Sequence, residues 1–207
     1  MNKRQAISVA GTLSNPSKMP CKGTSIPPVE CKTGGKLRLV EGSTCSDCYA
    51  CKGRYAMPSV QQALETRFNG LTHPDWVEAM ATLIGKAEYF RWHDAGDLQG
   101  LWHLANICRV CEATPDTRHW LPTREKGLVL RYSNEVGYLP ANLRIRVSAA
   151  MIDGNPPKVP VPLGTSGVHD KAPAKGHRCP APEQDGYCGD CRACWSFDVD
   201  HVSYHRH

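Results

Sequence analysis

Four cysteines stand within sixteen residues near the end of the chain, at Cys179, Cys188, Cys191 and Cys194. The last three are separated by two residues each, which lets neighbouring thiolates reach neighbouring irons of one 4Fe-4S cluster. Gly189 relieves the tight turn inside this triplet. Zinc is the alternative, because four thiolates suit it equally well, but structural zinc sites usually place C-x2-C pairs about a dozen or more residues apart. The spacing therefore favours a 4Fe-4S cluster.

A second C-x2-C-x2-C triplet lies in the first quarter of the chain, at Cys45, Cys48 and Cys51, with Cys31 and Cys21 upstream. Three thiolates on a 4Fe-4S cluster leave one iron open, where a substrate or S-adenosylmethionine can bind. A zinc knuckle, a site that shares ligands with the C-terminal cysteines, and no metal at all are the alternatives. The pattern favours a second iron-sulfur site.

Polar residues follow two of the predicted strands. His93, Asp94 and Asp97 come after the first, and Arg124 and Glu125 come after the second. The carboxyl ends of parallel strands meet at one rim, so these five residues are the candidate catalytic groups. The alternative is that Asp97 only caps a helix and that the other charged pair is solvated. Neither a nucleophile elbow nor a glycine-rich phosphate loop occurs in the sequence.

The elements that must position these groups alternate between short strands and helices. Strands are predicted at 36–40, 88–93, 119–123, 143–148 and 166–169, and helices at 59–70, 74–86, 97–113 and about ten residues from 124. Cys108 and Cys111 continue the apolar stripe of the third helix, so we expect them to pack in the core. Alternating strands and helices predict an α/β fold with parallel strands, a partial (β/α) barrel or an open sheet.

Composition changes divide the chain into three parts. Residues 1–35 are rich in Ser, Pro, Gly and Lys and are interpreted as an N-terminal arm, and residues 36–170 as the α/β core. Residues 171–207 form a cysteine-rich, metal-binding segment. This segment ends in an alternating stretch, which we expect to dock on the sheet as a strand.

The overall composition is that of a globular protein, with 207 residues, 41% hydrophobic and 22% charged. No apolar run reaches the roughly 18 residues of a membrane span, so we expect a cytoplasmic protein without a membrane partner. Eleven cysteines are unusual for a cytoplasmic protein, because thiols stay reduced in the cytosol and disulfides are rare there. A net charge of +5 permits a nucleic-acid partner, but no block of like charges indicates one.

Several motifs resemble, in the same order, those of the uncharacterised gene-product-88 family of bacteriophages and prophages. The resemblance covers the chain from about residue 17 to 207, and its motifs lie at residues 17–20, 42–50, 90–94, 120–125, 145–149, 188–195 and 203–207. It implies a phage-encoded protein in the cytoplasm of the host cell. It also implies seven family cysteines as ligands, which are Cys31, Cys45, Cys48, Cys179, Cys188, Cys191 and Cys194.

The Cys-Tyr-Ala element at 48–50 also resembles that of a phage family with radical-S-adenosylmethionine-like character, which implies a fold similar to a radical-enzyme core. The C-x3-C-x2-C signature of those enzymes is absent, because its first cysteine would fall on Glu41 or Thr44. Cys31 would have to supply the third ligand, and this departure argues against cleavage of S-adenosylmethionine.

Two functions are therefore expected. In the first, the chain is an iron-sulfur enzyme in which a cluster delivers an electron and the five polar residues at the rim bind or deprotonate a small molecule. An electron donor would then be a partner. In the second, a cluster or a zinc ion stabilises a module that binds nucleic acid or a host protein.

Overall fold

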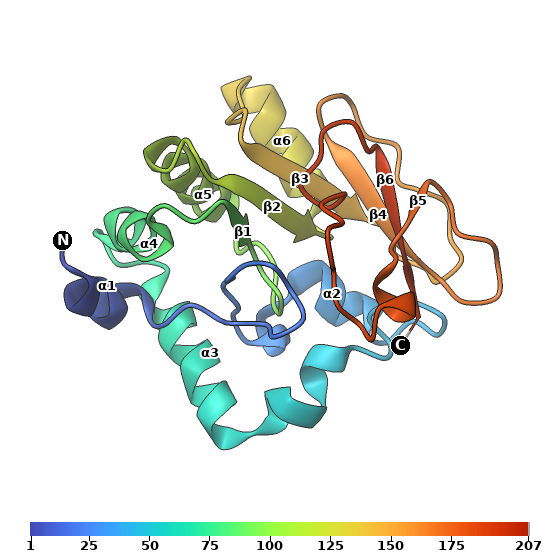
Figure 1. The fold of residues 1–207 in the computed structure, drawn as a ribbon, viewed down its shortest axis with the longest axis horizontal. Coiled ribbons are helices and arrows are strands. Elements are labelled where there is room, and N and C mark those ends of the chain that lie inside the picture. Colours follow the sequence, from blue (N-terminus) through green and yellow to red (C-terminus); the bar gives the residue numbers. More distant parts are fainter. Residues whose placement is uncertain (207) are drawn as a thin grey trace.

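The computed structural model describes residues 1–206 and contains a six-stranded parallel sheet in the order β1-β2-β3-β4-β6-β5 (Figure 1). The strands are β1 (Tyr89–Arg91), β2 (Arg118–Thr123), β3 (Leu143–Ser148), β4 (Gly164–His169), β5 (His177–Arg178) and β6 (His201–His205). Every neighbouring pair is parallel. The predicted partial β/α barrel is thereby confirmed, and the C-terminal strand β6 pairs with β4.

Six α-helices surround the sheet. They are α1 (Lys3–Ala10), α2 (Lys32–Leu37), α3 (Pro58–Gly70), α4 (Trp76–Ile84), α5 (Leu101–Ala113) and α6 (Lys126–Val136), counted over residues 1–206. Residues at the helix termini explain where several of these helices begin or end. Asn2 and Gln5 form a capping box at α1, Pro58 begins α3, and the left-handed Gly137 ends α6. None of these helices combines the length and apolar character that a membrane span requires.

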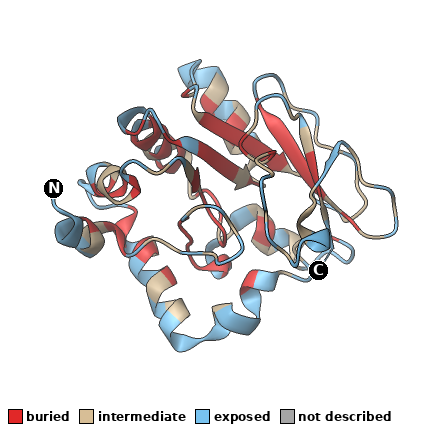
Figure 2. Cartoon of the chain, in the orientation of Figure 1, coloured by how far each residue is buried: buried red, intermediate tan, exposed pale blue. Residues whose placement is uncertain are grey.

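The main hydrophobic core lies between one face of the sheet and helices α1, α4, α5 and α6 (Figure 2). Phe90 and Leu121 come from the strands, and Leu104 comes from α5. Cys108 and Cys111 are part of this core, as the spacing of the apolar residues predicts. Their thiols are thus accounted for as packing atoms.

The prediction of a strand at 36–40 is wrong, because Lys32–Leu37 form helix α2. Five alternating residues are too few to separate a strand from a helix turn. The place beside β1 is moreover taken by the N-terminal arm, whose Gly23 forms a parallel bridge with Arg91. A Cβ on Gly23 would lie 2.8 Å from the Arg91 carbonyl oxygen, so this close approach needs glycine.

Other boundaries also differ from the expectation. The first helix of the βα units begins at Leu101 rather than at Asp97, and Gly100 occupies the N-cap position. Helix α1 was not expected, because the arm has little hydrophobic periodicity, yet two of its alanines are buried against the core. The cysteine loop at 41–52 consequently follows a short helix and not a strand.

The C-terminal cysteine segment is anchored to the other face of the sheet by Arg146 of β3, which is fully buried. Its guanidinium donates hydrogen bonds of 2.7–3.3 Å to the carbonyl oxygens of Thr165, Ala193, Cys194, Ser196, Val199 and Asp200. The indole N–H of Trp195 also donates to the carbonyl of Phe90 at 2.9 Å. Residues 193–200 are thereby fixed across β1, β3 and β4.

We expect Arg146→Met to lower the free energy of unfolding by about 3 kcal/mol or more, because several buried carbonyl groups lose their donor at about 1–3 kcal/mol each. The matched control is Arg131→Ala, which removes an exposed ion pair with Glu135 and is expected to change stability by about 0.5 kcal/mol or less. Urea unfolding followed by circular dichroism measures both. Equal midpoints for the two variants would contradict the anchoring role of Arg146.

Candidate functional site

A cavity of about 630 Å³ lies at the carboxyl ends of the parallel strands. Its lining comes from the loops after β1, β2 and β3, from β4 and β6, and from the segment between Cys31 and Tyr55. This is the rim at which the polar residues after the strands were expected to meet. Of the five candidate catalytic residues, His93, Asp94, Asp97 and Arg124 line the cavity.

His93 stands out because its backbone and its side chain are both unusual. Its φ is 53°, a left-handed conformation that is uncommon for any residue other than glycine. It is only 4% exposed, and within residues 1–206 neither ring nitrogen has a hydrogen-bond partner. Burial, and then the charge of Arg91, lower the pKa of His93 to about 3. Burial and the Arg91 charge both oppose protonation, so we expect the ring to be neutral near pH 7.

Asp94 is held by side chains from the cysteine loop, from the turn that follows it and from the arm. Its carboxylate accepts hydrogen bonds from the Tyr55 hydroxyl and from the Ser14 hydroxyl, each at 3.1 Å. The Tyr49 hydroxyl donates to its backbone carbonyl. Asp94 consequently ties the segment that covers the cavity to the end of β1.

Asp97 joins the loop after β1 to the end of β2. Its carboxylate accepts hydrogen bonds from the Thr123 hydroxyl at 2.5 Å, from the Arg124 amide at 2.8 Å and from its neighbour Leu98 at 2.7 Å. Burial raises the pKa of Asp97 to about 6, and the hydrogen bonds oppose this rise. The side chain does not cap α5, so the helix-cap interpretation of Asp97 is wrong.

Arg124 and Glu125 are adjacent in the sequence but serve different parts of the site. The Arg124 guanidinium donates to the carbonyl of Ala149 and also lies beside the Cys45 thiol. Glu125 does not line the cavity, and its carboxylate accepts the Thr33 amide at 2.8 Å. Glu125 thus positions the helix that follows Cys31.

Three of the predicted ligands, Cys31, Cys45 and Cys48, line the cavity, whereas Cys51 is exposed and does not. A Cβ on Gly34 would lie 3.5 Å from the Cys45 Sγ and 3.8 Å from the Cys31 Sγ. Glycine therefore leaves space between these two thiols. Burial raises the pKa of the Cys31 thiol to about 12, with the charge of Asp97 adding to the effect.

The segment that carries the four C-terminal cysteines passes from β5 to the N-terminal arm. The Cys179 amide donates to Ser203 of β6 at 2.9 Å, and the Cys188 amide donates to Lys18 of the arm at 3.1 Å. Cys191 turns back on Cys188 through a 3.1 Å backbone hydrogen bond. Burial raises the pKa of the Cys188 thiol, and the charges of Cys179 and Cys191 add to the effect.

Both cysteine groups have the donor chemistry that an iron-sulfur cluster requires, since all of these cysteines are free. The space at Gly34, which a Cβ would fill, also suits a group held between Cys31 and Cys45. Within residues 1–206, no three Cys, His, Asp or Glu side chains are arranged to hold a single metal ion. The cysteine groups therefore fit iron-sulfur clusters by the chemistry of their thiols and, for Cys31 and Cys45, by the space that Gly34 leaves between them.

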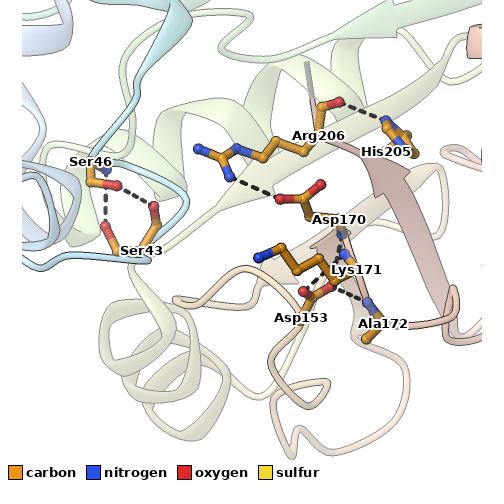
Figure 3. A network of polar contacts seen from close by, with 8 residues as sticks. All are labelled: Ser43, Ser46, Asp153, Asp170, Lys171, Ala172, His205 and Arg206. Atoms are coloured by element: carbon orange, nitrogen blue, oxygen red, sulfur yellow. Dashed lines mark hydrogen bonds and ion pairs between the residues drawn. The ribbon is translucent and has the colours of Figure 1, made fainter.

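A polar network fixes the rim of the cavity on the side of β4 and β6 (Figure 3). Arg206 forms an ion pair with Asp170 at 2.9 Å, and the Asp153 carboxylate accepts the amide of Asp170 at 2.7 Å. The Cys45 loop is attached to the end of β3 in turn, because the Thr44 amide donates to Ala150 at 2.9 Å. The Ser46 amide donates a 3.0 Å hydrogen bond to the Ser43 hydroxyl and closes the turn that contains Cys45.

Sequence reasoning missed several residues of the cavity. Arg91 of β1 lies over the Trp120 ring at 4.8 Å, and Tyr204 of β6 has its hydroxyl 3.2 Å from the Cys194 Sγ. Tyr49 and Tyr55 bring aromatic rings from the cysteine loop, 5.8 Å apart. The alternation of strands β1 and β6 was a signal for the first two, because it directs alternate side chains to the same face.

The buried neutral state of His93 predicts a pH effect on stability. Below the unfolded pKa of about 6.5, the unfolded chain binds a proton that folded His93 does not bind until near pH 3, so stability falls as the pH is lowered through this range. Asparagine tolerates the left-handed backbone at this position. When the pH is lowered from 6.5 to 5, we expect the free energy of unfolding of the His93→Asn variant to fall by about 2 kcal/mol less than that of the unsubstituted protein. Urea unfolding at the two pH values measures the difference. An unchanged pH dependence would show that His93 is protonated in the folded protein.

Comparison with known proteins supports a family and nothing further. The model of the family described as Gene product 88 matches residues 2–197. No curated protein and no solved structure matches the chain. The match covers nearly all of the sequence and includes both cysteine groups. The chain belongs to the gene product 88 family.

Proposed function

We propose that this protein binds two 4Fe-4S clusters beside one cavity, and that it acts there as a redox enzyme on a small molecule. The observation that supports this most is that one cavity is lined by the first cysteine group and by Tyr204, a residue that contacts the second group. Cys31, Cys45 and Cys48 line it directly, and Tyr204 lines it with a hydroxyl that lies 3.2 Å from the Cys194 Sγ. A volume of about 630 Å³ suits a small organic substrate or cofactor.

Cys179, Cys188, Cys191 and Cys194 are the proposed ligands of the first cluster. The C-x2-C-x2-C spacing and the turn between Cys188 and Cys191 support one compact site. Four protein thiolates would complete the coordination of this cluster. Its role would then be to carry electrons or to hold the segment in place.

Cys31, Cys45 and Cys48 are the proposed ligands of the second cluster. Cys31 is distant from the other two in the sequence, but helix α2 returns Gly34 to a position between its thiol and that of Cys45. Cys31 would thereby replace the cysteine that the C-x3-C-x2-C signature has and this chain lacks. Three thiolates would leave one iron of such a cluster without a protein ligand, and because all three cysteines line the cavity, a ligand bound there could supply the fourth bond.

The other cavity residues have roles that follow from their charges. A 4Fe-4S cluster, when bound, accepts and supplies single electrons. Arg91 and Arg124 are cations that can bind an anionic group of the substrate, and the Asp94 carboxylate, which accepts hydrogen bonds from Tyr55 and Ser14, lines the same cavity. His93 also lines the cavity, and both of its buried ring nitrogens lack a hydrogen-bond partner within the described residues, so a shift of the ring would let one of them bond a ligand. These groups would orient a polar small molecule.

Metal analysis tests this proposal. Protein purified without oxygen should contain iron and acid-labile sulfide in equal amounts, with a broad absorbance near 400 nm. We expect Cys188→Ser/Cys191→Ser and Cys45→Ser/Cys48→Ser each to lower the iron and sulfide content by about half. Cys51→Ser, which changes an exposed cysteine outside the cavity, is the matched control and should change neither.

The outcome that contradicts the proposal is stoichiometric zinc without acid-labile sulfide. It would favour instead a zinc-stabilised module that binds nucleic acid or a host protein. If only one of the two double variants loses iron, the cluster whose ligands that variant removes is supported, and the other cluster is contradicted.

A second measurement tests the enzymatic part. If the open position of the second cluster binds S-adenosylmethionine, protein reduced with dithionite should convert it to methionine and 5′-deoxyadenosine, and Cys31→Ser should abolish both products. Mass spectrometry detects them. Fully loaded protein that forms neither product would exclude this cofactor and favour another redox substrate or a binding module.

A further inference from the structure

We infer that Tyr204 donates a hydrogen bond to the Cys194 thiolate, and that this bond sets the reduction potential of the C-terminal cluster and connects it to the cavity. The inference rests on the proposed function, because it concerns a cluster held by the C-terminal cysteines. It adds a role for a residue that is neither a ligand nor one of the five candidate catalytic groups.

The position of Tyr204 carries the inference. Tyr204 lies in β6 opposite Val168 of β4, and its side chain lines the cavity. Its hydroxyl oxygen is 3.2 Å from the Cys194 Sγ, and its ring centroid is 6.5 Å from that of Trp120. Within residues 1–206, it is the cavity-lining side chain that hydrogen-bonds one of the four C-terminal thiols.

Cys194 is held firmly in front of this hydroxyl. Its carbonyl oxygen accepts the Nε of the buried Arg146 at 2.9 Å. The next residue, Trp195, packs edge-to-face on Trp120 with centroids 5.3 Å apart. Both the donor and the sulfur therefore belong to parts of the structure that packing fixes, so the contact does not depend on a flexible loop.

The direction of the bond follows from the state of the sulfur. A thiolate that ligates iron has no proton, so it can only accept, and the phenol must donate. Reduction adds negative charge to a cluster and its ligands, and a donor to a ligand sulfur stabilises that charge. Hydrogen bonds to the sulfurs are accordingly one of the factors that set cluster potentials. Removing the hydroxyl should make the cluster harder to reduce.

The test uses the full chain carrying Cys45→Ser/Cys48→Ser, so that only the C-terminal cluster titrates. In this background we expect Tyr204→Phe to lower the equilibrium constant for one-electron reduction about tenfold, which corresponds to a midpoint about 59 mV more negative. Redox titration followed by electron paramagnetic resonance measures the midpoint. Tyr55→Phe is the matched control, because Tyr55 lines the same cavity but bonds Asp94, and it should leave the midpoint unchanged.

A second variant keeps the test decisive if Tyr204→Phe fails to load the cluster. Difluorotyrosine at position 204 retains the shape of the side chain and donates a stronger hydrogen bond, so the midpoint should become more positive. Normal iron and sulfide content with an unchanged midpoint would overturn the inference and leave the proposed function intact. Absence of iron and sulfide from the unsubstituted protein would overturn the proposed function and, with it, the inference.

Discussion

The arrangement of the site depends on the hydrogen bonds of Arg146. Helices α1, α4, α5 and α6 pack on one face of the parallel sheet, and residues 193–200 cover part of the other face. These residues have no regular backbone pairing of their own, so their carbonyl groups need donors. The Arg146 guanidinium supplies them from the middle of β3. The position of Cys194, and of the cysteines before it, is thereby set by the sheet.

The parallel direction of the strands explains why Cys31, Cys45 and Cys48 line the same cavity as Tyr204, whose hydroxyl contacts Cys194. All loops that follow the strands emerge at the same rim, and the N-terminal arm adds a parallel bridge beside β1 through Gly23. The segment after Cys179 then crosses from β5 to this arm, where the Cys188 amide bonds Lys18. The two open edges of the half-barrel are thus connected by the cysteine segment itself (Figure 1).

The elements that periodicity describes well could be predicted from the sequence. Strand β3 has six alternating residues, and α5 has an apolar stripe, so both were placed correctly or nearly so. The helix at Lys32–Leu37 could not be predicted, because its identity depends on the arm occupying the sheet edge. The roles of Arg146 and Tyr204 were equally hidden, since each depends on a partner distant in the sequence. The spacing of cysteines in the sequence indicates possible ligands, but it does not indicate the distant residues that position those ligands.

The charges on the covered face link the fold to its proposed cofactors. Arg91, Arg144 and Arg146 all lie on the strands beneath the cysteine segment, and within residues 1–206 none of them forms an ion pair with a carboxylate. Carbonyl dipoles satisfy hydrogen bonds but leave the positive charge uncompensated. Thiolate-bound clusters carry net negative charge and would supply that compensation at Cys188 and Cys194. Folding of the C-terminal segment and loading of its cluster should then stabilise each other.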